Sequence, residues 1–148
     1  MQLEIVKPDL EEVAIALDKA IVPFEYPLEE LLDTETQTYT REIFVPKGHL
    51  IIGKKHKTSC INILAKGKML VKSCLEDLGK EIAADKTTVT FMTQAGAQKI
   101  GYAIEDCIFI NVFSNVQATK LEDVETELII PSEKLDKYLE EKELKWLG

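Results

Sequence analysis

The spacing of hydrophobic residues changes twice along the chain. Apolar residues recur at helical spacing near the start, which predicts an amphipathic helix over Asp9–Ile21 that ends at Pro23. From Arg41 to Phe113 the apolar residues instead form short β-branched runs between glycines and prolines. Helical spacing returns after Thr119. The pattern predicts a mainly β domain with an N-terminal helix and C-terminal helices.

Turn residues punctuate the β-rich region roughly every 8 to 12 positions, a rhythm typical of a sandwich or barrel. The runs expected to form strands are Glu42–Val45, His49–Ile52, Thr58–Ala65, Lys68–Ser73, Glu81–Ala84, Thr87–Thr93, Gln98–Ala103 and Cys107–Phe113. Gly67 is expected to mark a turn between two of these strands. Ahead of them, Leu28–Leu32 is expected to form a short helical turn, and Thr34–Thr40 a loop or an exposed edge strand.

The C-terminal region carries the signals of two helices. Thr119 and Glu122 have the spacing of a capping box, in which side chains satisfy backbone N–H groups at a helix start. The stripe expected to be buried on this helix is Leu121, Val124 and Leu128. Ser132 is expected to cap the final helix, whose apolar residues are Leu135, Tyr138 and Leu139.

Composition narrows the class of protein. A chain of 148 residues that is 45% hydrophobic is long enough for one domain with a real core. We expect a single domain over 1–148, with an N-terminal segment (1–40), a β-barrel core (41–115) and C-terminal helices (119–148). The net charge of −8 disfavours nucleic acid as a partner.

The expected location follows from what the sequence lacks. No apolar stretch reaches the roughly 18 residues that a membrane helix needs, and the first residues do not form a signal peptide. The three cysteines do not form a paired pattern, which fits a reducing compartment. We therefore expect a cytoplasmic protein with no membrane partner.

Two stretches, Gly48–Gly67 and Thr88–Ala103, resemble the two sequence motifs of the cupin superfamily. The spacing of the first motif is kept, with His56 at its second histidine position. Lys54 replaces the first histidine and Cys60 replaces the glutamate. In the second motif, Lys99 stands at the fourth metal-ligand position. The resemblance implies a jelly-roll β-barrel with a pocket in which most metal ligands have been replaced.

A closer resemblance is to a group of short cupin-like proteins of bacteriophage and prophage genomes. The shared segments are Gly53-Lys-Lys-His-Lys57, AGAQKIGYAIEDC at Ala95–Cys107, and EDVETELI at Glu122–Ile129. This resemblance implies a phage or prophage origin, and with it the host cytoplasm or the virion as location. That group carries no established activity, so no reaction is implied.

The motif positions and the nearby polar cluster define a candidate ligand site. Its residues are Lys54, His56, Cys60, Lys99, Tyr102 and Glu105. Two lysines that face inward repel a cation and favour an anion such as a carboxylate or a phosphate. The sequence therefore favours a module that binds a small molecule or an anion, with no cofactor. Cupins often pair their sheet edges, so a homo-oligomer, in the simplest case a homodimer, is also expected.

Three alternatives stay open. A metal-free isomerase or epimerase could use His56 as base and Tyr102 as acid, with Glu105 as a further acid–base candidate. A site for a divalent metal is the less favoured alternative. It would use His56 and Cys60 as ligands and need others from Glu105, Asp106 or His49. A virion or assembly component would use the barrel as a scaffold only. Asp106 could instead bond backbone N–H groups in its turn, and Glu105 could pair with Lys99.

Overall fold

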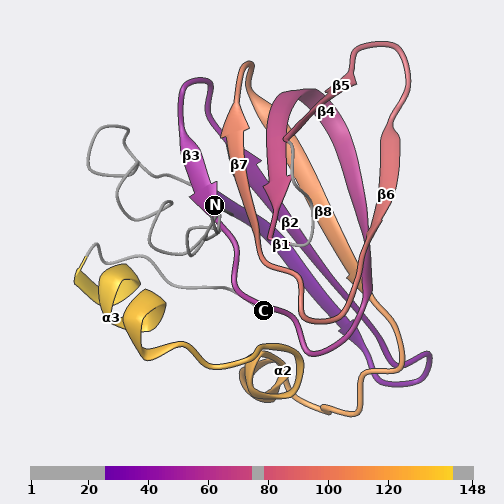
Figure 1. Ribbon diagram of the computed structural model, residues 1–148. Helices are drawn as coiled ribbons and strands as arrows, with labels where there is room; N and C mark the ends of the chain where they lie inside the picture. The colour runs from indigo at the N-terminus through magenta and orange to yellow at the C-terminus, as the bar shows by residue number, and fades with distance from the viewer. Residues whose placement is uncertain (1–25, 75–78, 142–148) are drawn as a thin grey trace, which may run out of the picture.

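The computed structural model describes residues 26–74 and 79–141, so the expected helix over Asp9–Ile21 lies outside the described residues. The chain forms strands and then two short helices (Figure 1). The elements are β1 (Tyr26–Asp33), β2 (Thr38–Val45), β3 (Leu50–Ile52), β4 (Cys60–Ser73), β5 (Lys80–Ala84), β6 (Val89–Thr93), β7 (Lys99–Ala103), β8 (Cys107–Phe113), α2 (Leu121–Leu128) and α3 (Glu133–Glu141). The predicted mainly β fold with C-terminal helices is confirmed.

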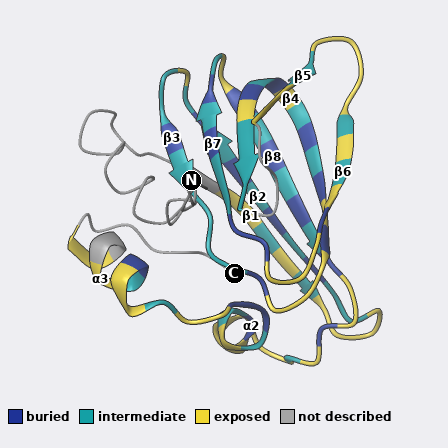
Figure 2. Cartoon of the chain, viewed as in Figure 1, coloured by how far each residue is buried: buried dark blue, intermediate teal, exposed yellow. Residues whose placement is uncertain are grey.

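The strands form one curled antiparallel sheet, a half-barrel, in the order β1-β2-β8-β4-β7-β3. Strands β5 and β6 both pair with β4 outside this path. The first half of β4 pairs with β8 and β6, and its second half pairs with β7 and β5. The sheet thus folds over into two facing layers (Figure 1). Alternate residues of β2 and β8 are buried between them (Figure 2).

Gly67 is not a turn, which corrects the sequence prediction. The segments Thr58–Ala65 and Lys68–Ser73 belong to the single strand β4, and the register to β8 shifts between Leu64 and Lys66. Gly67 has φ +98°, and a Cβ there would overlap the carbonyl oxygen of Asp106. Only glycine combines this backbone conformation with such a close approach, so it lets β4 pass from one layer to the other.

The prediction of a helical turn at Leu28–Leu32 is also wrong. These residues lie in β1, where Leu31 pairs with Thr40 and Glu30 pairs with Arg41. Backbone pairing with β2 overrides the weak local preference for a helix. The segment Thr34–Thr40 divides into a turn and the start of β2, which lies between β1 and β8 rather than at an edge.

Helix α2 packs against one end of the half-barrel. Val124 and Leu128 are buried against Tyr39, Cys60 and Phe113. Ile129, the residue after α2, belongs to the same buried cluster. The segment that contains it pairs with the loop after β3. There Lys57 donates its N–H to the Leu128 carbonyl (2.7 Å), and Ile130 donates to Lys55 (2.9 Å). The C-terminal region is therefore part of the wall beside the barrel interior.

The predicted capping box of α2 does not form. The N-cap residue is Lys120, and it has no side-chain capping hydrogen bond. The helix begins one residue after it, which leaves Leu121 43% exposed and reduces the buried stripe to Val124 and Leu128. The predicted cap of α3 is confirmed, since Ser132 Oγ accepts a hydrogen bond from the Leu135 N–H (3.4 Å). Within residues 26–74 and 79–141, neither helix is long and apolar enough to span a membrane.

Replacing Gly67 tests the strand crossing. We expect Gly67→Ala to lower the free energy of unfolding by at least about 3 kcal/mol, because strain and a backbone overlap add together. The matched control is Gly96→Ala, since Gly96 has φ +84° but open space around its Cβ position. Its expected cost is about 1 kcal/mol. Urea unfolding measures both values, and equal losses would contradict the close approach at Gly67.

Candidate functional site

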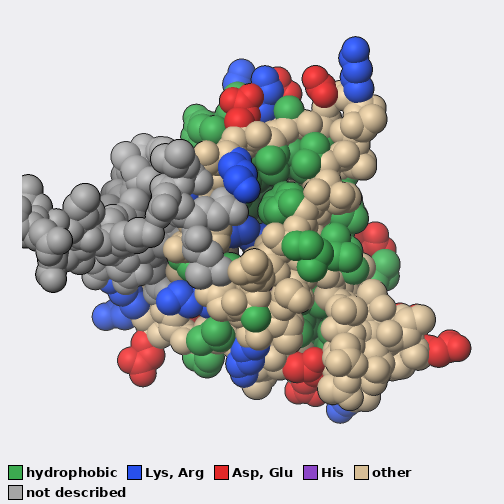
Figure 3. Space-filling view, turned by 45° about the vertical axis from the view of Figure 1, so that its right-hand side comes forward, with side chains coloured by type: hydrophobic (Ala, Val, Ile, Leu, Met, Phe, Trp, Pro, Cys, Tyr) green, Lys and Arg blue, Asp and Glu red, His purple; other side chains and the backbone are tan. Residues whose placement is uncertain are grey.

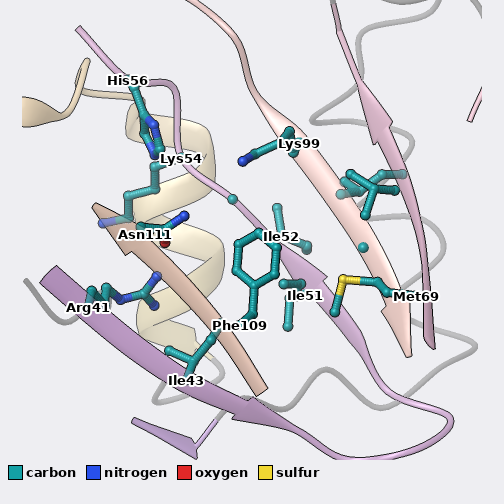
Figure 4. A pocket seen from close by; sticks show the side chains of 14 residues that line it. Arg41, Ile43, Ile51, Ile52, Lys54, His56, Met69, Lys99, Phe109 and Asn111 are labelled. Carbon is teal, nitrogen blue, oxygen red and sulfur yellow. The ribbon is translucent and has the colours of Figure 1, made fainter. Parts of the chain in front are cut away.

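A cavity of about 50 Å³ lies between the two layers of the half-barrel (Figure 4). Its apolar wall includes Ile51 and Phe109. The polar residues that line it are Arg41 from β2, Lys54 and His56 from the loop after β3, Lys99 from β7 and Asn111 from β8. No aspartate or glutamate lines the described part of this cavity. The cavity is therefore a mainly apolar space with an excess of basic groups.

A second hollow of about 250 Å³ lies on the other side of Lys99. Its lining comes from β4, β5, β6 and the start of β7, and it includes Ile82, Val89 and Phe91. Hydrophobic side chains gather on the face that Figure 3 presents, where β5 and β6 lie. Because Lys99 lines both spaces, its side chain stands between the inner cavity and the larger hollow.

Lys99 is the centre of a buried polar network. Its Nζ donates to Asn62 Oδ1 (2.8 Å) and to Thr93 Oγ1 (2.6 Å). Asn111 Nδ2 donates to the same Asn62 oxygen (2.7 Å). The rings of Phe91 and Phe109 lie 5.4 and 5.5 Å from Nζ, within the range of cation–π attraction. Among the described residues Lys99 forms no ion pair, and the two groups that accept hydrogen bonds from its amine are neutral.

This environment changes the acidity of Lys99. Burial lowers the pKa of its amine from 10.5 to about 8, and the Cys60 thiol opposes the shift in part. Desolvation disfavours the charged form, and in the part of the chain that the structure describes no carboxylate pairs with the amine to restore it. The side chain therefore titrates near neutral pH, which an exposed lysine does not do.

His56 is held in its neutral form beside this network. Its side chain is buried, its Nδ1 lies 3.6 Å from Cys60 Sγ, and its ring centroid lies 5.2 Å from that of Phe113 in a T-shaped arrangement. Burial lowers the pKa of His56 to about 4, with Lys99 and Arg41 adding to the shift. Burial also raises the pKa of the Cys60 thiol, so the pair is neutral at physiological pH. A protonated thiol is a poor nucleophile.

Lys54 carries its charge away from the cavity. Its side chain is only 10% exposed and contributes to the cavity wall, but its ammonium pairs with Glu125 of α2 and with Asp136 of α3 (3.3 Å). The two carboxylates neutralise this lysine and tie both C-terminal helices to the loop after β3. Of the two motif lysines, only Lys99 presents its amine to the interior.

Tyr102 and Glu105 do not reach the cavity. Tyr102 is adjacent to Gly101, whose Cβ position faces Met69 and Ile51 in the interior, so strand alternation turns Tyr102 to the outer face. Glu105 is exposed in the turn between β7 and β8. The structure thus gathers His56, Cys60 and Lys99 from the predicted set and separates them from Tyr102 and Glu105.

Asp106 has a structural contact, as one sequence alternative supposed. Its Oδ1 accepts a hydrogen bond from the Lys47 N–H (2.9 Å). His49 is also outside the cavity lining, and its Nδ1 lies 3.0 Å from the Lys47 carbonyl oxygen. Neither residue joins His56 and Cys60.

Two cavity residues were missed by the sequence reasoning. Arg41 lies in β2 and Asn111 lies in β8, and in both strands every second residue is buried. That alternation turns both polar side chains inward between apolar neighbours. A polar residue in the buried register of a strand was the available signal.

The donor set does not fit a cupin metal centre. Among the residues that the structure describes, no three His, Cys, Asp or Glu side chains lie close enough to hold one ion. His56 and Cys60 supply at most two ligands, whereas metal sites use three or more from the protein. The buried cation of Lys99 adds repulsion at the fourth motif position.

Comparison with solved structures defines the fold. A cupin superfamily protein from Desulfitobacterium hafniense has a TM-score of 0.51 with this chain, over 62% of this chain and 77% of its own, at 6% identity. The fold is that of the cupins. A cupin domain from Bordetella pertussis matches with a TM-score of 0.49, over 64% and 96% of the two chains at 13% identity. An RmlC-like cupin family protein from Methanocaldococcus jannaschii gives 0.48, over 63% and 82% at 18% identity.

These likenesses carry the fold and no activity. No family model matches the sequence, and a search of curated proteins finds no match. Function therefore has to be argued from the cupin-type cavity itself.

The buried His56 predicts a pH-dependent stability. Its pKa is lower in the folded state (about 4) than in the unfolded chain (6.5), so its contribution is complete above pH 6.5 and is lost as pH falls toward 4. The loss is on the order of 3 kcal/mol. Urea unfolding between pH 4 and 7.5 measures it, and His56→Gln is expected to flatten the curve relative to wild type. An unchanged slope in this variant would contradict the assignment.

The ion pairs of Lys54 are expected to contribute more to stability than the exposed pair of Lys68 with Glu81. We expect Lys54→Gln to lower the free energy of unfolding by about 1 kcal/mol, because two carboxylates lose a shielded partner. The control is Lys68→Gln, whose 3.8 Å pair with Glu81 is exposed and is worth at most about 0.5 kcal/mol. Urea unfolding at low and high salt checks both, and equal effects would refute the anchoring role of Lys54.

Proposed function

We propose that this protein is a binding module for a small carboxylate held inside the half-barrel by Lys99, Arg41 and His56. The observation that carries the proposal is the amine of Lys99, which faces a cavity and forms no ion pair among the described residues. A buried ammonium without a counter-ion is costly, and an incoming anion offsets that cost.

The charges around the cavity support an anion rather than a cation. Arg41 and Lys99 both act on His56, lowering its pKa, so their fields overlap at the cavity. His56 and the amide of Asn111 add neutral hydrogen-bond donors. Since no acidic side chain lines the described cavity, a carboxylate that enters it meets hydrogen-bond donors and positive charge on the cavity wall.

The volume limits the ligand. A space of about 50 Å³ holds a group of about three or four heavy atoms. That suits a carboxylate and is too small for a sugar nucleotide. An apolar tail can extend past Lys99 into the larger hollow, whose lining includes Ile82 and Phe91. We therefore favour short aliphatic carboxylates.

The biological setting belongs to this proposal as well. A phage or prophage origin and a place in the host cytoplasm are supported by the motif resemblance alone. A homodimer is proposed on the same ground.

Calorimetric titration with butanoate tests the binding site. We expect a single site per chain, with affinity at least about tenfold weaker in Lys99→Met, because the variant loses the cation that faces the ligand. The control is Lys72→Met, since Lys72 pairs in register with Ile100 on the opposite side of the same sheet. Equal affinity in wild type and Lys99→Met would refute the site, as would the absence of any binding to the folded wild type.

A further inference from the structure

We propose that Lys99 captures small 2-oxo carboxylates as a Schiff base at this site. The inference rests on the proposed function, because the same cavity holds the carboxylate. It adds a covalent step and a substrate class: a carbonyl carbon that carries a carboxylate on one side and a short apolar chain on the other.

The hydrogen bonds of Lys99 suit a neutral amine. A neutral amine has two N–H donors and one lone pair, whereas an ammonium has three donors. The structure provides two acceptors, Asn62 Oδ1 at 2.8 Å and Thr93 Oγ1 at 2.6 Å. Both donors of the neutral form are therefore satisfied, and the lone pair is left to attack a carbonyl carbon.

Burial favours that neutral form. It lowers the pKa of the amine to about 8, whereas the flanking rings of Phe91 and Phe109 attract the charged form and offset part of the desolvation. Desolvation of a lysine in an apolar pocket is one established way to activate it as a nucleophile. At pH 7.5 about a quarter of Lys99 is unprotonated, against roughly 0.1% of an ordinary lysine.

The two spaces beside Lys99 match the two substituents of a 2-oxo acid. On one side lies the inner cavity, where Figure 4 shows the amine of Lys99 and the guanidinium of Arg41 with Asn111 between them. On the other side lies the larger hollow between β5 and β6, lined in part by Val89 and Phe91. A carbonyl carbon at Lys99 would thus place its carboxylate inward, near Arg41, and its alkyl chain outward.

The step balances without an oxidant or a reductant. The Nζ lone pair forms a C–N bond to the carbonyl carbon, and the C=O π pair takes a proton to give a carbinolamine. Nitrogen then loses a proton, its lone pair forms the C=N bond, and the hydroxyl leaves with a proton as water, which gives the protonated imine. Loss of the remaining N–H proton to water gives the neutral imine, so two protons are taken up and two are released. The net change is amine plus ketone to imine plus water.

Reductive trapping of the full chain tests the proposal. The protein is incubated with 2-oxobutanoate and cyanoborohydride at pH 7.5, and the adduct is located by intact mass and peptide mapping. We expect one adduct per chain, on Lys99, formed at least about tenfold faster than on any other lysine. Since mapping is done on the wild type, the result does not depend on a variant that folds.

Two variants and two analogues refine the test. Lys99→Arg keeps the charge but is expected to lose the adduct, whereas Lys72→Arg is expected to keep it. Butanone, in which a methyl group replaces the carboxylate and the ketone is kept, is expected to modify Lys99 at least about tenfold more slowly than 2-oxobutanoate, because Arg41 no longer orients it. Butanoate, which lacks the carbonyl, is expected to compete with trapping.

The outcomes separate this inference from the binding function. Butanoate binding with no preferred adduct on Lys99 would overturn the Schiff base and leave the carboxylate site standing. A Lys99 adduct that forms equally fast from butanone, with no butanoate binding, would support the reactive amine and overturn the carboxylate site. Adducts spread over surface lysines, with no binding, would overturn both.

Discussion

The passage of β4 from one layer to the other is the constraint on which the half-barrel depends. Four strands pair with β4, two through its first half and two through its second. The change of partners occurs at Gly67, where the backbone is left-handed and meets Asp106 too closely for a side chain. Because both layers share this strand, its crossing fixes the distance and the angle at which their inner faces meet. The cavity lies between those faces, so its shape follows from the crossing.

The crossing also explains how a lysine can be buried. Asn62 lies on the first half of β4, while Lys99 and Thr93 come from strands that pair with its two halves. Their side chains converge only because β4 belongs to both layers. Burial of an ammonium is unfavourable by several kcal/mol, and hydrogen bonds to neutral groups with two flanking rings offset only part of it. The amine is consequently easy to deprotonate and attractive to an anion.

Much of the β region was predictable from sequence, because β-branched runs between turn residues carry a local signal. The errors occur where distant pairing overrides that signal. Leu28–Leu32 forms a strand because it pairs with β2. Gly67 was predicted to lie in a turn, but its positive φ angle occurs inside β4, where the strand passes from one layer to the other. Motif spacing placed His56, Cys60 and Lys99 in one predicted site, and the structure brings these three side chains near one another. It could not show that Lys54 turns to α2 and α3, because those carboxylates lie far along the chain.

The residues at the replaced motif positions change the chemistry of the cavity, but the cavity still carries positive charge. In this cavity an ammonium on β7 supplies the positive charge near His56 and Cys60, and a fixed cation selects an anion as its partner. An amine differs from a metal ion because it can lose a proton and expose a lone pair. Lys99 lies between a cavity with an excess of basic groups and a larger hollow lined by both apolar and polar side chains, so the proposed capture of a 2-oxo acid uses the same side chain to attract the carboxylate and to react with the carbonyl. That combination requires the burial that the β4 crossing imposes.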